Sequence, residues 1–301
     1  MTTDEPRAAP VPIAGAATGY YGRPLLKKPV WTWEIPLYFF IGGAAGAAAL
    51  IAETAHWTGS SRRLVRDAQR LAAVGGLLSP VLLISDLGRP ARFLYMLRVF
   101  KPQSPMSVGV WIVLAFSNAA AGAAAVSFAP RRARARLPVR LLERGLSASA
   151  AMTGVGMSTY TGVLIGVTAI PAWAQHVRLL PLHFAYSGLA TAVSILQLLG
   201  HGQRGLRRLG MAAGVIETAV GVLLETTGDR DPAPLRHGRS GMLMRAAGVL
   251  SGPLPLGLRL LRRIPAAAAS SIAGALLTRF AWIRAGQTSS QDPAPALALQ
   301  R

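Results

Sequence analysis

Long apolar stretches with few or no charged residues alternate along the chain with short stretches rich in arginine. Six of the apolar stretches, together with their flanking residues, are long enough to cross about 30 Å of hydrocarbon as α-helices. They are residues 35–52, 71–85, 103–129, 145–170, 182–200 and 209–224. The shortest of them, 71–85, needs part of the preceding 66–70 to complete a span. The pattern predicts an all-α protein, a polytopic bundle of transmembrane helices.

The pattern is less regular in the last third of the chain. Residues 242–258 are apolar, but they contain Arg245, Pro253 and Pro255, so this segment could span the membrane, re-enter it or lie on its surface. Residues 264–283 form a last apolar stretch, in which the Arg279 side chain is expected to extend toward the membrane surface. We therefore predict about eight helices, of which the seventh is uncertain.

The predicted bundle covers residues 31–285, between a polar N-terminal tail at 1–30 and a polar C-terminal tail at 286–301. Glycines recur four residues apart within three of the predicted spans, at Gly42 and Gly46, Gly162 and Gly166, and Gly210 and Gly214. Such pairs allow the backbones of neighbouring helices to approach closely. They favour a packed bundle and carry no information about function.

The composition supports a membrane protein. Apolar residues make up 51% of the chain and charged residues only 15%, whereas about 25% is usual in soluble domains. A net charge of +20 would by itself suggest a nucleic-acid partner, but the basic residues lie between apolar stretches, where they can meet anionic lipid. We expect a multi-pass protein of the cell membrane (the inner or plasma membrane) that binds no nucleic acid. Basic loops on both faces leave its orientation open.

Residues that could hold a redox cofactor are scarce. The chain has no cysteine, so it cannot bind an iron–sulfur cluster through thiolates. Its five histidines fall at or beyond the ends of the predicted helices and form no pair inside the bundle, which argues against a haem held between two histidines. The sequence therefore predicts no haem, no iron–sulfur cluster and no metal site in this chain.

Glu34 opens the first predicted span and is surrounded by the aromatic residues Trp31, Trp33 and Tyr38. The helix dipole stabilises a carboxylate at a helix N-terminus, and aromatic residues gather at membrane interfaces, so these residues could be purely structural. They could equally form an aromatic-lined pocket in which Glu34 accepts a proton from a bound ring. The residues alone leave both interpretations open.

Glu217 falls near the centre of the sixth predicted span. A carboxylate that faces lipid at this depth is costly, so we expect Glu217 to face the bundle and to be either protonated or paired. Glu225 lies two turns later on about the same helix face. A step in a proton path and a buried hydrogen-bonding acid remain alternatives for Glu217.

A turn-forming sequence follows the second predicted span. Asp86 ends the span and Gly88 permits a tight turn. Arg89, Arg92 and Tyr95 then recur at three-residue spacing, which predicts that they share one face of a short helix near the lipid headgroups.

Several segments, taken in chain order, carry a resemblance to a known family. They are WTWEIPLYFFIGGAAG at 31–46, DLGRPARF at 86–93, PQSPMSVGVW at 102–111, YTGVL at 160–164 and AGQTSSQDP at 285–293. Together they resemble the polysulfide reductase/NrfD family of integral membrane subunits. The segments are spread over most of the chain, and it is their order that makes the resemblance specific. The interrupted seventh helix and the Arg- and Pro-rich stretch at 228–240 depart from the family pattern.

The resemblance implies a subunit of an oxidoreductase complex that is not catalytic alone. Such a subunit exchanges electrons and protons between the quinone pool, menaquinone or ubiquinone, and a ferredoxin-like iron–sulfur subunit, itself docked to a catalytic subunit, often of the molybdopterin type. It implies a quinone pocket near the start of the first helix and the loop after the second. The residues placed near that pocket are Trp33, Glu34, Tyr38, Asp86, Arg89 and Tyr160. The basic loop at 86–101 could dock the partner subunit.

Two other functions stay open from the sequence. A secondary transporter or ion channel could use Glu217 as a coupling-ion site, although no inverted repeat with matched broken helices is visible. A structural membrane anchor could hold a soluble enzyme without binding quinone. The ordered segments favour the redox subunit, because a generic anchor does not require them.

Overall fold

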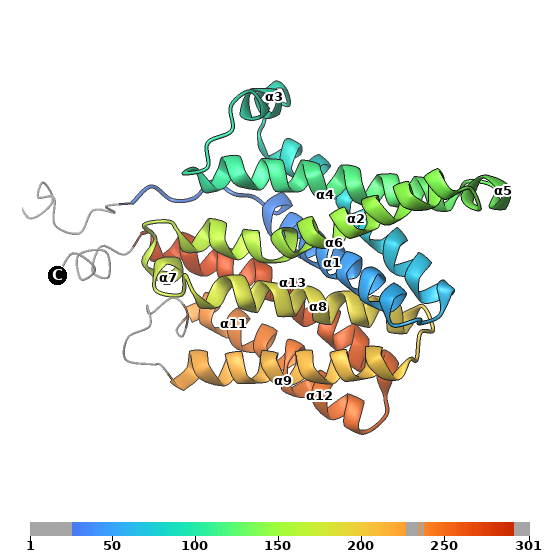
Figure 1. Cartoon of the computed structure of the whole chain (residues 1–301). Helices are drawn as coiled ribbons and strands as arrows, with labels where there is room; N and C mark the ends of the chain where they lie inside the picture. Colours follow the sequence, from blue (N-terminus) through green and yellow to red (C-terminus); the bar gives the residue numbers. More distant parts are fainter. Residues whose placement is uncertain (1–25, 227–234, 236–237, 292–301) are drawn as a thin grey trace, which may run out of the picture.

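The structure is a computed structural model that describes residues 26–226, 235 and 238–291, and every regular element in this part is a helix. The first half contains α1 (Glu34–Trp57), α2 (Arg62–Asp86), α3 (Ala91–Leu97), α4 (Pro105–Ser127), α5 (Arg131–Arg134) and α6 (Leu137–Gly166). The second half contains α7 (Pro171–Ala174), α8 (Leu179–Leu198), α9 (Arg204–Thr226), α11 (Gly238–Ser251), α12 (Pro253–Leu260) and α13 (Ile264–Ser289). The long helices lie alongside one another in one bundle (Figure 1), so the all-α prediction is confirmed for the described residues.

Five of the described helices are long and apolar enough to cross a membrane, namely α1, α2, α4, α8 and α13. Each overlaps one of the predicted spans, but the predicted total of about eight is not confirmed. Ser, Thr and Tyr residues lower the hydropathy of α6, and an Arg-rich first turn and Glu217 lower that of α9. The seventh predicted helix is split between two short helices. In Figure 1, α6 and α9 nevertheless run beside the five.

Serine residues determine where two of the helices begin. The Ser61 side chain accepts a hydrogen bond from the backbone N–H of Leu64 and caps α2, so this helix starts well before the apolar stretch and includes the arginines that precede it. The Ser104 side chain caps α4 in the same way, and Pro105 occupies the first helical position. The expected extension of the second span into residues 66–70 is confirmed.

Small residues bring α1 into close contact with its neighbours. A Cβ atom placed on Gly46 would lie 2.3 Å from the carbonyl oxygen of Gly154 on α6, and one placed on Gly188 of α8 would lie 2.7 Å from the carbonyl oxygen of Gly43. Neither position can accept a larger residue without moving a backbone. The expectation that glycines mark close helix approaches is confirmed at Gly46, and α1 lies between α2, α6 and α8 as a result.

The seventh predicted helix is broken in the middle. α11 ends at Ser251, Gly252 adopts a non-helical conformation, and α12 starts at Pro253. The break lies against α9, because a Cβ atom on Gly252 would be 2.9 Å from the backbone nitrogen of Thr218. A proline that starts a helix lacks only an N–H group that would be unpaired anyway. The broken helix therefore packs inside the bundle beside α9.

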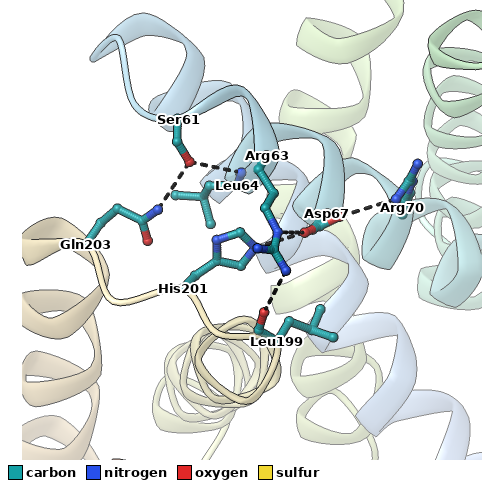
Figure 2. Close-up of polar contacts among 8 residues, drawn as sticks. All are labelled: Ser61, Arg63, Leu64, Asp67, Arg70, Leu199, His201 and Gln203. Carbon is teal, nitrogen blue, oxygen red and sulfur yellow. Dashed lines mark hydrogen bonds and ion pairs between the residues drawn. The ribbon is translucent and has the colours of Figure 1, made fainter.

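A polar junction joins the two halves at the end of the bundle where α2 begins and α8 ends. His201, in the loop after α8, has its Nε2 atom 2.9 Å from Asp67 Oδ2 on α2, and Arg63 and Arg70 flank the same carboxylate at 3.7 and 3.4 Å. The Gln203 amide donates to the Ser61 side chain. Figure 2 shows these side chains converging from α2 and from the loop before α9.

Candidate functional site

The start of α1 and the end of α2 meet through a threonine. The Thr32 hydroxyl lies between two carboxylates: it is hydrogen-bonded to Glu34 Oε2, and its oxygen is 3.3 Å from Asp86 Oδ1. A hydroxyl has one proton to donate, so it can satisfy either carboxylate but not both at once. Both carboxylates are half-buried. Two of the residues predicted for the quinone pocket, 52 positions apart in sequence, are thus brought together.

Two tyrosines lie deeper in the bundle, below this junction. Tyr38 on α1 and Tyr160 on α6 are both buried, and Tyr160 is close enough to interact electrostatically with Tyr38. The ring of Tyr160 rests on the backbone of α4 at Gly109, where any side chain would overlap it. The sequence motif around 102–111 therefore contains a glycine that makes room for a predicted site residue from another helix.

The other two predicted site residues lie at the surface. Trp33 is 59% exposed and Arg89 is exposed. Gly88 has a positive φ of 66°, as the turn prediction requires, but α3 starts only at Ala91. Arg89 therefore precedes the helix, and the prediction that it shares a helix face with Arg92 and Tyr95 is wrong. The cause is the turn, which continues through Pro90.

An aromatic stack closes the same end of the bundle. Trp31 stacks on Trp173 of α7 with ring centroids 5.5 Å apart, and the Trp173 indole N–H donates to the carbonyl oxygen of Trp282 at 2.8 Å. The Gln287 amide on α13 donates to the carbonyl oxygen of Trp31. Trp173 is completely buried, and its ring fills the space beside Gly286.

A second polar group lies inside the other half of the bundle. Glu217 on α9 is 2% exposed, and its Oε2 atom is 3.7 Å from His183 Nδ1 on α8. Arg279 on α13 is 1% exposed, interacts electrostatically with Glu217, and donates to the carbonyl oxygen of Phe184 at 2.9 Å. The prediction that Glu217 faces the bundle is confirmed.

The other two members of this group were misjudged or missed from the sequence. Arg279 was expected to extend toward the membrane surface, but α13 continues to Ser289, and the guanidinium instead packs 3.8 Å above the Phe184 ring. His183 was placed at a helix end, whereas α8 begins earlier, at Leu179, and buries it. No spacing in the sequence connects residues 183, 217 and 279, so only the packing of the helices reveals them. Glu225 belongs to the last turn of α9, but its side chain lies outside the described part.

The residues that could hold a metal ion are not gathered together. Within residues 26–226 and 238–291, no three side chains of the metal-binding types form a cluster. The polar groups at the start of α1 and at Glu217 combine carboxyl, hydroxyl and imidazole groups with flat aromatic rings.

The comparison with known families decides the affiliation of the chain. The family described as "Polysulphide reductase, NrfD" matches residues 25–222, about two thirds of the sequence. The chain belongs to this family. No individual curated protein matches it.

Membership of the NrfD family indicates a membrane subunit of a redox complex. The matched region begins before α1 and ends inside α9, so it includes every residue predicted for the quinone pocket as well as Glu217. The break at Gly252 and Arg279 follow the matched region. The family pattern therefore covers the whole polar group at the start of α1, but only Glu217 and His183 of the second group.

Proposed function

We propose that this NrfD-family chain is the quinone-facing membrane subunit of an oxidoreductase complex in the cell membrane. It would exchange electrons and protons between the quinone pool and a ferredoxin-like iron–sulfur subunit. That subunit would in turn contact a catalytic subunit, for example one of the molybdopterin type. The observation that carries the proposal is the Thr32 junction, which joins Glu34 and Asp86 at one end of the bundle, above the buried Tyr38 and Tyr160.

The proposed quinone site has a chemical logic in this chain's own residues. Quinones undergo two-electron, two-proton chemistry, so the ring needs proton-exchanging groups beside it. Glu34 and Asp86 supply carboxylates, and the Thr32 hydroxyl can donate its hydrogen bond to either of them. Tyr38 and Tyr160 supply flat walls and hydroxyl groups. Trp33 and Arg89, which are exposed, would contact the ring's tail, a lipid headgroup or the partner subunit.

Glu217 has a separate part in the proposal. It is buried at bilayer depth beside His183, a second group that can bind and release a proton. We assign it to proton transfer within the membrane, together with Glu225 as a further acid on the same helix. A transporter would also use a buried acid, but the family match favours the redox role.

The quinone site is tested by Glu34→Gln in the intact complex. The substitution keeps the shape of the side chain but removes the proton-accepting carboxylate, so quinol-coupled turnover should fall on the order of 10²-fold. Dye-linked activity of the soluble partner subunits, which bypasses the membrane subunit, should not change.

Glu53→Gln is the matched control, because Glu53 lies at the opposite end of the same helix, where it accepts hydrogen bonds from Ser147 and Trp57. This variant should retain quinol-coupled turnover. If Glu34→Gln lowers both activities equally, the effect is on assembly, and the assignment of the quinone site to this end of α1 is wrong.

A further inference from the structure

A cavity of about 380 Å³ lies between α9, α11 and α13, away from the start of α1. Its walls are mostly apolar, with side chains such as Val220, Met244 and Pro253. Its volume falls within the range of about 300–1,000 Å³ that is typical of small-molecule sites. Neither the family match nor the proposed quinone site accounts for it.

The cavity has an opening on the outer surface of the bundle. Val222 on α9 and Val249 on α11 line it and are 57% and 52% exposed. Because α11 packs mainly on α13 and only lightly on α9, the opening lies between α9 and α11. Beside helices that cross a membrane, such exposed valines would meet hydrocarbon, and a ligand that enters here would come from the bilayer.

The inner end of the cavity is polar. Glu217 and His183 line it, together with the hydroxyl-bearing Thr218, Ser251 and Thr278. Both carboxyl oxygens of Glu217 and the Nδ1 atom of His183 are buried, and their contacts with one another, with Ser251 and with Arg279 leave them short of hydrogen bonds of good geometry among the described residues. Unsatisfied polar atoms are costly at membrane depth, so this end of the cavity would be stabilised by a ligand that brings a hydrogen-bonding group.

We propose that this cavity binds a neutral, membrane-soluble molecule with an apolar body and one carbonyl or hydroxyl group, which hydrogen-bonds to Glu217 or His183. Arg245 also lines the cavity but already has an interaction within the protein, and bringing a charged headgroup away from the interface would cost several kcal/mol. A quinone and a monoacylglycerol share the required chemistry, and they come from different membrane pools. The site is separate from the quinone site proposed at α1 and stands or falls independently of it.

Two glycines allow the cavity to be filled without disturbing the bundle. Gly221 on α9 and Gly248 on α11 line the cavity, and a Cβ atom on either would meet no described atom within 4 Å. Gly221→Leu and Gly248→Leu should therefore occupy the ligand's space. Gly145 on α6 is equally unobstructed but lies elsewhere, so Gly145→Leu is the matched control.

The test is photolabelling of the full-length chain in its native membranes with two probes, an azidoquinone with a short tail and a monoacylglycerol carrying a diazirine. Labelled peptides are mapped by mass spectrometry, with and without an excess of the unlabelled compound. We expect one probe to label α9 and α11 in a way that the unlabelled compound suppresses. Gly248→Leu and Gly221→Leu should each reduce this labelling about tenfold, the loss produced by about 1.4 kcal/mol of binding energy, and Gly145→Leu should not.

The identity of the labelling probe distinguishes a quinone from a lipid ligand. The proposal is overturned if neither probe labels these helices, if the unlabelled compound does not compete, or if both leucine variants retain full labelling. Failure of both variants to fold would overturn it too, since a cavity that admits a ligand has room for a leucine. Quinol-coupled turnover plays no part in this readout, so the result is independent of the Glu34→Gln experiment.

Discussion

The two halves of the bundle differ in the kinds of side chain that they bury. Around α1, the interior consists of alanine, glycine and aromatic side chains, and its buried polar residues on α2, α4 and α6 are uncharged, namely Gln69, Ser79, Ser117, Ser158 and Thr161. Around α8, α9 and α13, the interior contains His183, Glu217 and Arg279, and α12 adds Arg259. Close backbone contact occurs in both halves, for example at Gly46 in the first and at Gly274 in the second, but only the second encloses several fully buried groups that can carry charge among the described residues.

This difference indicates a division of labour. Helices that approach at glycine have little freedom to move, and they can hold the Thr32 junction in a fixed position. Buried ionisable groups cost stability within a membrane and are usually functional there. Arg259 is a buried group of this costly kind, because its guanidinium is hydrogen-bonded only to uncharged partners among the described residues, Gln197 at 2.7 Å and Ser194 at 3.2 Å. Close contact at glycine would therefore supply rigidity in both halves, and the second half would add the chemistry inside the membrane.

The largest effect should follow from disturbing the close contact in the first half. Gly46→Leu places a side chain where the Gly154 carbonyl lies, so α1 and α6 must separate. Overpacking of this kind should cost about 3 kcal/mol or more and greatly reduce the yield of folded protein. Size-exclusion chromatography and thermal unfolding in detergent measure both. Gly145→Leu, on an unobstructed face of α6, should have little effect, and equal loss in the two variants would show that contact at Gly46 is not special.

A smaller effect on stability, but a specific one on function, is expected in the second half. Glu217→Gln keeps the side-chain shape and removes the acid, so assembly should remain normal while proton uptake slows at least about tenfold. Uptake is followed with a pH-sensitive dye in vesicles that contain the complex, with Glu53→Gln as the control. Unchanged proton uptake and turnover would show that Glu217 is a structural acid. The second half of the bundle would then not differ from the first in carrying out proton transfer.

The first half was largely predictable from the sequence, and the second was not. The span of α1, the Gly88 turn and the approach of Asp86 to Glu34 follow from local patterns and from the order of the family segments. The group of His183, Glu217 and Arg279 comes from three helices with no shared spacing. Its members meet because α8 packs against both α9 and α13, and α13 also continues past its apolar stretch to Ser289, whose hydroxyl accepts a hydrogen bond from the Ala172 N–H.

The broken helix shows the same limit. Pro253 and Pro255 indicate an interruption, but the sequence cannot tell whether a proline-containing segment re-enters the membrane, spans it or lies on its surface. Packing of Gly252 against Thr218 shows a broken helix that lies beside α9. The cavity beside it could not be predicted at all, because it is a space that the side chains of α9 and α11 leave unfilled.

The smallest effect is expected where the two halves meet at the polar junction of Figure 2. Asp67→Asn removes the charge that His201, Arg63 and Arg70 share; His201 is buried, but both arginines are exposed to water and salt and Asp67 is partly so. The free energy of unfolding should fall by no more than about 1 kcal/mol, and the difference should shrink further at high salt. Thermal unfolding in detergent at two salt concentrations measures it, with Gln203→Ala as an uncharged control. A loss of stability as large as that of Gly46→Leu would mean that electrostatics at this junction, and not helix packing, holds the two halves of the bundle together.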